Sequence, residues 1–252
     1  MKFASLGSGS QGNATLVEAA DTCLLVDCGF SMRETVRRLD QLQRSPDQLS
    51  AIVVTHEHGD HIKGVMPLAR KYQLPVYLTA GTAKAVVERS QQVDIRIVRD
   101  AEPFTIGALR VQPVAVPHDA REPVQYLFYH GNLCLGVLTD LGSVTPYVTQ
   151  CYQHCDGLLL ECNHDLQMLA SGPYPASLKQ RVSGPWGHLN NHQSADLLSQ
   201  LECSRLQHLV LGHISLQNNC LERVREAVTP QLSGVGQVHY ACQDEGFGWL
   251  QL

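Results

Sequence analysis

Short runs of apolar residues, bounded by glycine, asparagine and aspartate, recur along the whole chain and predict β-strands. The run at residues 51–55 is continuous, as expected of a strand that is buried on both faces. The predicted strands cover residues 3–6, 15–19, 23–26, 51–55, 76–79, 95–98, 109–116, 126–129, 133–139, 158–162 and 209–212.

Between these runs, apolar residues recur at helical spacing. The first such stretch opens with a Ser-x-x-Glu capping box at Ser31 and Glu34, followed by apolar residues at positions 36, 39 and 42. Further helices are predicted over residues 65–72, 82–90, 193–201 and 221–228. Strands and helices mix in both halves, so we expect an α/β fold of two mixed sheets with helices on their outer faces, in one domain over residues 1–252.

The composition is that of a globular protein. Apolar residues make up 44% of the 252 residues, and 20 glycines and 12 prolines are spread along the chain, which excludes a coiled coil, a collagen and a disordered tail. No stretch approaches the roughly 18–20 apolar residues of a membrane span, and the first residues lack the apolar core of a secretory signal. We therefore expect a cytoplasmic protein with no membrane partner.

The net charge and the cysteine content bear on two further classes, nucleic-acid-coating proteins and disulfide-stabilised proteins. Nineteen basic and 24 acidic residues leave a net charge of −5, which is unlike a protein that coats nucleic acid by bulk electrostatics. A local nucleic-acid site stays open, because metal ions can add positive charge that the sequence count misses. The nine cysteines are an odd number without a Cys-x-x-Cys pair, which favours reduced thiols over a disulfide framework.

Side chains that can bind metals are most concentrated directly after the buried strand at 51–55, where residues 55–61 read Thr-His-Glu-His-Gly-Asp-His. Imidazole nitrogens and carboxylate oxygens are the ligands expected for zinc or a similar divalent ion. His56 and His58 can face one ion while Asp60 and His61 turn to a second, with the intervening glycine permitting the bend. A solvated turn is the alternative.

The pattern His-x-His-x-Asp-His resembles the metallo-β-lactamase fold superfamily. Three further marks of that superfamily follow in order at the ends of predicted strands: His118, Asp140 and His213. The resemblance covers essentially the whole chain and implies a four-layer αββα sandwich with a binuclear metal site at one edge. By that likeness one metal is held by His56, His58 and His118, the other by Asp60, His61 and His213, and Asp140 bridges the two.

Two divalent ions about 3.5–4 Å apart can share a hydroxide, bring its pKa near neutrality and stabilise both the attacking and the leaving oxygen. Asp60 is therefore expected to be catalytic as well as a metal ligand. The expected cofactor is a pair of divalent ions, zinc first and manganese as the alternative, since His/Asp sites accept several metals.

Finer motifs resemble the YycJ/WalJ-type nucleases, bacterial members of the superfamily with 5′-to-3′ exonuclease activity on DNA. The motifs lie at residues 8–13, 161–165, 172–175, 187–191 and 212–219. The chain departs from the family pattern at Asn190 and Gly212, where serine is usual. Both departures concern contacts with the substrate, and neither removes a candidate metal ligand.

A second resemblance, to ribonuclease Z, implies a catalytic pair. In that family a strand-end Glu and a His in a Gly-His motif help to protonate the leaving oxygen, and Glu161 and His188 occupy similar places. A carboxylate that orients an imidazole and raises its pKa suits a general acid. The alternatives are a strand-end salt bridge for Glu161 and a helix-start residue without chemistry for His188.

Serine, asparagine and histidine in the site loops are candidates for substrate binding. Ser8, Ser10 and Asn13, with neighbouring backbone N–H groups, could hold a phosphate beside the metals. Neutral donors in the other loops suit a terminal phosphate or the nucleic-acid backbone; they are Asn163, His164, Asn191, Ser215 and Asn218. Hairpin formation and loop capping are the alternatives.

The expected function is a metal-dependent phosphodiesterase, a 5′-to-3′ DNA exonuclease acting at 5′-phosphorylated ends, with RNA as the less favoured substrate. Residues 141–212 carry the motifs already named, which excludes the large inserted domain of the β-CASP nucleases. Asp60-His61 disfavours antibiotic hydrolysis, because penicillinase-type relatives replace part of that pair with cysteine. Hydrolysis of small phosphodiesters or thioesters, RNA processing, and a non-catalytic metal-binding or nucleic-acid-binding module are the alternatives.

Overall fold

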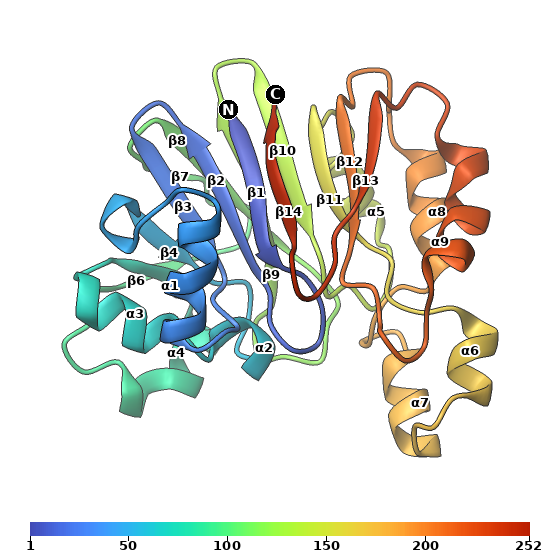
Figure 1. Ribbon diagram of the computed structural model, residues 1–252, viewed down its shortest axis with the longest axis horizontal. Coiled ribbons are helices and arrows are strands. Elements are labelled where there is room, and N and C mark those ends of the chain that lie inside the picture. Colours follow the sequence, from blue (N-terminus) through green and yellow to red (C-terminus); the bar gives the residue numbers. More distant parts are fainter.

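Two seven-stranded sheets face each other at the centre of the molecule, and helices cover their outer faces (Figure 1). The computed structural model describes residues 1–252, with the side chain of Arg89 excepted. The first sheet has the order β14 (Phe247–Gln251), β1 (Lys2–Gly7), β2 (Ala14–Ala19), β3 (Thr22–Val26), β4 (Ala51–Val53), β5 (Val76–Thr79), β6 (Ile95–Val98). The second has the order β13 (Gln237–Tyr240), β12 (His208–Gly212), β11 (Gly157–Glu161), β10 (Leu133–Leu138), β9 (Val124–His130), β8 (Leu109–Ala115), β7 (Phe104–Ile106).

Each sheet has an antiparallel half and a parallel half. In the first sheet β14, β1, β2 and β3 pair antiparallel, and β3 to β6 pair parallel. In the second, β7 to β10 pair antiparallel and β10 to β13 parallel. The carboxyl ends of parallel strands lie at one edge of a sheet, and the loops that follow them are where sites of layered α/β folds form.

Helices pack on the outer face of each sheet, and two short ones project beyond the body (Figure 1). The first sheet carries α1 (Met32–Gln41), α2 (Gly59–Ile62), α3 (Val65–Tyr72) and α4 (Ala80–Val86), with the 3₁₀ turns Pro46–Gln48 and Val87–Arg89. The second sheet carries α5 (Pro146–Cys151), α8 (Asn191–Gln200), α9 (Leu221–Val228) and the 3₁₀ turn Thr229–Gln231, while α6 (Leu166–Ser171) and α7 (Ala176–Val182) project below it. Among the described residues, no helix is both long and apolar enough to cross a membrane.

Three buried apolar clusters hold the layers together. The central cluster lies between the sheets and includes Phe3, Tyr126 and Phe128. The other two lie between each sheet and its helices, around Leu16 in the first half and Leu158 in the second. The αββα sandwich of two mixed sheets expected from the sequence is confirmed.

Local differences from the expected elements have physical causes. The strand expected over 51–55 ends at Val53, because Thr55 turns to donate both its N–H and its hydroxyl to Asp27. At the start of α1, Ser31 accepts the Glu34 N–H as expected, but the Glu34 carboxylate binds Arg37 and Arg38. The helix expected over 82–90 is divided into α4 and a 3₁₀ turn.

Candidate metal centre and its cleft

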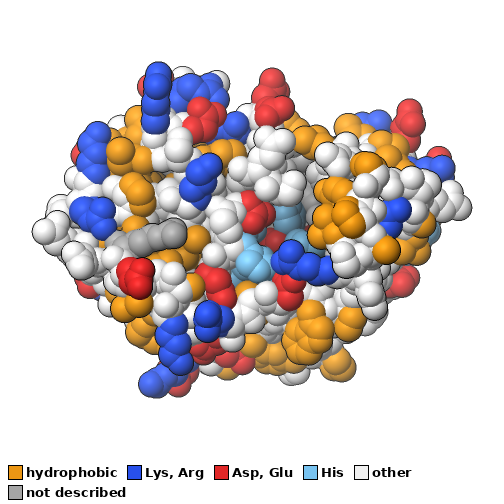
Figure 2. Space-filling view, turned by 90° about the horizontal axis from the view of Figure 1, so that it is seen from below, with side chains coloured by type: hydrophobic (Ala, Val, Ile, Leu, Met, Phe, Trp, Pro, Cys, Tyr) orange, Lys and Arg blue, Asp and Glu red, His pale blue; other side chains and the backbone are white. Residues whose placement is uncertain are grey.

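Loops from both sheets meet around a cavity of about 370 Å³ at the lower edge of the sandwich. Figure 2 shows histidine side chains at the bottom of this hollow, with acidic side chains and a basic side chain beside them. The predicted site residues that line it are Ser10, His58, Asp60, Asp140, Asn163, His188, His213, Ser215 and Asn218. Each half of the chain therefore supplies one wall.

His56, His58 and His118 form the first ligand group. One ring nitrogen of each lies within 4.8 Å of the others, and His118 Nε2 is 3.2 Å from His58 Nδ1. His56 follows β4 of the first sheet and His118 follows β8 of the second, so the group joins the two layers. Burial, and then the charge of His61, lower the pKa of His56 well below its ordinary value, which leaves that ring neutral with a lone pair available.

The second group is formed by Asp60, His61 and His213, whose ligand atoms also lie within 4.8 Å of one another. Asp140 lies between the groups, with Oδ2 3.1 Å from His61 Nε2 and Oδ1 3.9 Å from His118 Nε2. Asp140 and His213 each end a strand with a left-handed backbone, φ 53° and 52°. Such a conformation is uncommon for residues other than glycine and is typical of functional sites.

Each of the five candidate ligand imidazoles has one nitrogen hydrogen-bonded to an oxygen of the surrounding protein. The other nitrogen lies within the cluster, where His58 Nδ1 and His118 Nε2 contact each other and His61 Nε2 lies 3.1 Å from Asn13 Nδ2. The protein acceptors are Thr55 Oγ1 for His56, Asp27 Oδ2 for His61, and the carbonyl oxygens of Asp119 for His58 and Gly187 for His118; Glu161 Oε1 accepts from His213. Outer partners of this kind orient metal-binding histidines.

Three buried atoms of this cluster have no hydrogen-bond partner among the described residues: His56 Nε2, His213 Nε2 and Asp140 Oδ2, the last of which is in ion-pair range of His61. Leaving a buried polar atom unpaired costs about 1–3 kcal/mol. A divalent cation would satisfy all three, and imidazole and carboxylate are suitable ligands for it. The residues present therefore fit a divalent metal centre.

Asp27 is a supporting residue that sequence analysis missed. Its Oδ2 accepts a hydrogen bond of 2.8 Å from His61 Nδ1, while both its oxygens accept from Thr55, each at 2.8 Å. It follows β3 with φ 60°. The signal that could have identified it is the one that identified Asp140: an aspartate directly after a buried strand.

Glu161 and His188 are in direct contact. The Nδ1 atom of His188 lies 2.7 Å from Glu161 Oε1, and the other oxygen accepts from the backbone N–H groups of Leu141 and Leu189, each at 3.0 Å. Burial raises the pKa of Glu161, but the charges of His188 and His213 and their hydrogen bonds outweigh it and lower the pKa to about 2. The carboxylate therefore stays ionised, and His188 has Nε2 free for the cleft that it lines.

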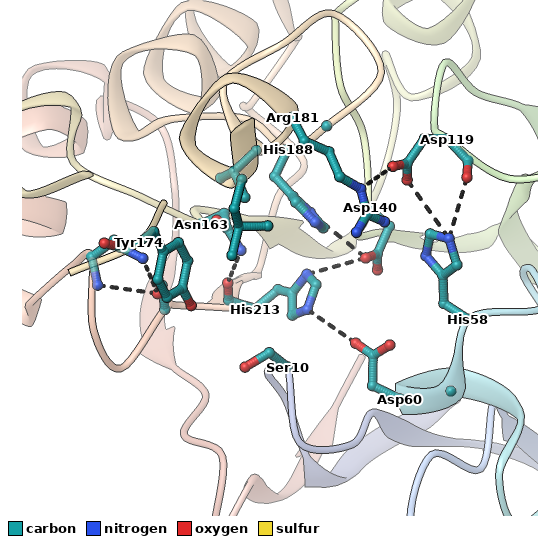
Figure 3. Close-up of a pocket in the computed structure, with 16 residues that line it drawn as sticks. Ser10, His58, Asp60, Asp119, Asp140, Asn163, Tyr174, Arg181, His188 and His213 are labelled. Atoms are coloured by element: carbon teal, nitrogen blue, oxygen red, sulfur yellow. Dashed lines mark hydrogen bonds and ion pairs between the residues drawn. The ribbon is translucent and has the colours of Figure 1, made fainter. Parts of the chain in front are cut away.

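The eight candidate substrate residues divide into two sets. Ser10, Asn163, Ser215 and Asn218 line the cavity, and Figure 3 shows Ser10 and Asn163 on opposite sides of His213. The buried Asn218 has an Oδ1 without a partner among the described residues. These four side chains lie at the cavity, although Asn163 Nδ2 also donates to the His213 carbonyl oxygen at 3.0 Å and Ser215 Oγ accepts the Asn218 N–H at 3.1 Å.

The other four candidates, Ser8, Asn13, His164 and Asn191, are outside the cavity lining and are engaged within the protein. Ser8 Oγ accepts the His213 N–H at 2.8 Å. Asn13 holds the loop through Gly9 and lies 3.1 Å from His61 Nε2. His164 is fully buried beside Asn163, and the side chain of Asn191 donates a hydrogen bond to Asn219 Oδ1.

Two further charged residues of the cavity, Asp119 and Arg181, were not anticipated from the sequence, and Tyr174 was noted only as part of the motif at 172–175. Asp119 Oδ1 lies 3.6 Å from His58 Nε2, and the Asp119 carboxylate pairs with Arg181 (Figure 3). Asp119 follows a predicted ligand directly and could have been suspected for that reason. Arg181 lies on a polar helix far along the chain, where no sequence pattern marks it.

Comparison with known proteins agrees with this arrangement. The family model described as β-lactamase superfamily domain matches residues 22–214. The exodeoxyribonuclease YycJ of Bacillus anthracis is 37% identical over 94% of this chain and 92% of its own. The exodeoxyribonuclease WalJ of Streptococcus pneumoniae is 36% identical over 93% and 91%.

Two solved structures share the fold at low sequence identity. The metallo-β-lactamase fold protein YhfI of Bacillus subtilis has a TM-score of 0.75 at 19% identity, covering 99% of this chain and 98% of its own. Zn²⁺-bound PqqB of Methylobacterium extorquens has a TM-score of 0.76 at 17% identity, covering both chains fully. At this identity the likeness concerns the fold alone.

Proposed function

The chain belongs to the β-lactamase superfamily and, within it, to the family of the exodeoxyribonucleases YycJ and WalJ; from this premise we propose that it is a metal-dependent phosphodiesterase that degrades DNA from the 5′ end. The observation that carries the proposal is the contact of 2.7 Å between His188 and Glu161, placed at the cavity beside Asp140. A ligand cluster alone could serve storage or structure. A buried, ionised carboxylate that orients a cleft imidazole is the arrangement of a general acid.

The ligand groups divide between two divalent ions. His56, His58 and His118 would hold one, Asp60, His61 and His213 the other, and Asp140 would contact both. We propose zinc as the first metal to test and manganese as the second. When bound, such ions would lower the pKa of a water molecule and stabilise negative charge on phosphoryl oxygens.

His188 would donate the proton that the leaving oxygen needs when the P–O bond breaks. Its Nδ1 is held by Glu161, which fixes the ring and leaves Nε2 as the atom that would donate the proton. Glu161 is thus a positioning residue, since it acts through His188. Positioned proton donors typically contribute about 10²–10⁴-fold to the rate.

We place the terminal phosphate of the substrate at the neutral polar side chains of the cavity. Ser10, Asn163, Ser215 and Asn218 line this region, and hydroxyl and amide groups are suited to phosphate oxygens. RNA is the less favoured substrate of the same site. The cytoplasmic location of the protein stays a prediction from the sequence.

A substrate screen tests the proposal. Purified protein, supplied with Zn²⁺ or Mn²⁺ or treated with EDTA, is incubated with DNA, RNA, cyclic nucleotides and glutathione thioesters. We expect metal-dependent release of nucleotides from DNA, and loss of that release in EDTA. Hydrolysis of a thioester or a cyclic nucleotide with DNA left intact would replace the proposal with a small-molecule hydrolase on the same site.

A further inference from the structure

Arg181 brings a fixed positive charge into a cavity that three aspartates and three histidines also line. Among the 16 residues that line the cavity in the described part of the chain, it is the one lysine or arginine, against the carboxylates of Asp60, Asp119 and Asp140. Figure 3 shows its side chain reaching from α7 toward Asp119, close to Asp140 and His188. Its guanidinium therefore lies beside the reaction centre without belonging to the ligand groups.

Most of the hydrogen-bonding capacity of this guanidinium is left for a ligand. Nε donates to Asp119 Oδ2, and Asp119 is its bonding partner among the described residues. The side chain is 58% exposed, and its hydrogen bond to Asp119 uses Nε alone, so Nη1 and Nη2 remain as donors. A guanidinium with two adjacent N–H₂ groups matches the oxygens of a phosphate in a bidentate way.

Helix α7 presents its Arg181 face to the cavity and contributes nothing to the core. No residue of the helix is buried, and Leu178, Arg181 and Val182, spaced three and four positions apart, all line the cavity. Lys179 on the same helix donates to the Ala170 carbonyl instead. The contacts of α7 are thus with the cavity rather than with the core, which places its side chains where a substrate would bind.

We propose that Arg181 binds a non-scissile phosphate of the nucleic acid and so makes the site selective for polynucleotides over small phosphodiesters. The inference rests on the proposed function. In a chain of net charge −5, a phosphate beyond the reach of the metal ions is bound more tightly where a fixed cation lies beside it. Asp119 orients that cation in advance, and the paired guanidinium still has donors to offer.

The phosphate bound by Arg181 has two possible sources. It is either the terminal 5′-phosphate, which Arg181 would then share with the neutral side chains named above, or the first internucleotide phosphate beyond the scissile one. Both offer the same oxygens to a guanidinium, so the test has to separate them by substrate rather than by affinity alone.

The test compares Arg181→Gln with Lys179→Gln, which removes the same charge from the same helix but outside the cavity. Each variant is assayed on paired 5′-phosphate and 5′-hydroxyl oligonucleotides and on bis(4-nitrophenyl) phosphate. Hydrogen bonds to a charged group predict that Arg181→Gln raises KM for DNA about ten- to a hundredfold, with kcat little changed. The loss of kcat/KM on the small diester should be at least about tenfold smaller, because that substrate has no second phosphate.

If Arg181→Gln lowers kcat/KM only on the 5′-phosphate oligonucleotide, Arg181 binds the terminal phosphate. If it lowers kcat/KM equally on both oligonucleotides, Arg181 binds the internucleotide phosphate. Binding of a labelled oligonucleotide to EDTA-treated protein, followed by fluorescence anisotropy, gives a readout without hydrolysis. There Arg181→Gln should weaken binding and lower the slope of log K against log salt by about one.

The outcomes separate the two proposals. If the wild type binds DNA but hydrolyses nothing, the proposed function is wrong. The Arg181 proposal is then decided by whether Arg181→Gln binds the labelled oligonucleotide more weakly than the wild type. Wild-type binding and KM in Arg181→Gln, or an equal loss in Lys179→Gln, would overturn the Arg181 proposal. A wild-type protein that neither binds nor cleaves DNA would overturn both.

Discussion

The Oε1 atom of Glu161 lies 2.7 Å from His188 Nδ1 and 3.0 Å from His213 Nδ1. One buried carboxylate thus orients both the candidate acid and a candidate metal ligand. Its other oxygen is held by two backbone amides, so the side chain cannot turn away from either imidazole. This links the geometry of proton donation to the geometry of the metal centre.

His188→Ala and Glu161→Gln are expected to differ in metal content. Loss of the acid in His188→Ala should lower kcat on DNA about 10²–10⁴-fold with metal retained. Glu161→Gln should lower kcat and also weaken metal binding about 10–100-fold, because His213 loses its outer partner. Steady-state kinetics and elemental analysis measure both. Full activity in His188→Ala would remove the acid assignment.

Metal stoichiometry should follow the two ligand groups. His118→Ala is expected to lose the first ion, Asp60→Ala and His213→Ala the second, and Asp140→Ala to weaken both. Asp60→Ala should also abolish hydrolysis while folding and DNA binding stay nearly intact, because two ions act together. Elemental analysis with circular dichroism checks this. Wild-type turnover in metal-saturated Asp60→Ala would indicate a one-metal enzyme.

Metal binding should release protons and weaken as the pH falls. Burial lowers the pKa of His213, but Asp140, Asp60 and Glu161 outweigh it and raise the pKa to about 10 in the metal-free protein. The ring is therefore protonated at neutral pH and must lose that proton before it binds a metal. Calorimetric titration with Zn²⁺ in buffers of different ionisation enthalpy measures the release. A heat of binding independent of the buffer would contradict it.

Arg38→Ala should destabilise the fold by about 2–4 kcal/mol, since three buried or partly buried carbonyls would lose their donor. Its Nη1 donates to the carbonyls of Leu6, Gln243 and Asp244, at 2.7, 3.1 and 2.7 Å. These contacts join α1 to β1 and to the C-terminal segment that holds the 8–13 loop. Urea unfolding measures the effect. The matched variant Arg37→Ala, at an exposed arginine of the same helix, should change stability little.

The candidate metal ligands could be located from the sequence because their positions depend on local sequence. His56 to His61 lie within six residues of one another, and His118, Asp140 and His213 each follow a strand that its apolar run reveals. The strands β7, β13 and β14 were missed, because β7 has only three residues and half-exposed residues break the apolar pattern of the other two. The helices α6 and α7 were missed because they bury almost nothing, and α2 and α5 because four and six residues are too few to show a helical period.

Side-chain direction within loops could not be predicted. Ser8 and Ser10 are two residues apart, yet Ser8 supports the His213 backbone while Ser10 faces the cavity. Asn190 caps α8, and its neighbour Asn191 is buried against Asn219. Arg181 acquires its place only when α7 folds back over the cleft, which is a tertiary contact without a local signal.

The central claim, metal-dependent attack on DNA from a 5′ end, is tested most directly by a time course on paired oligonucleotides labelled at the 3′ end. One of the pair has a 5′-phosphate and the other a 5′-hydroxyl, each with Zn²⁺ or Mn²⁺ and with EDTA. Hydrogen bonds to the terminal phosphate predict an initial rate about ten- to a hundredfold higher for the 5′-phosphate, with nothing cleaved in EDTA. Equal rates, products shortened from the 3′ end, or cleavage that persists in EDTA would contradict the account.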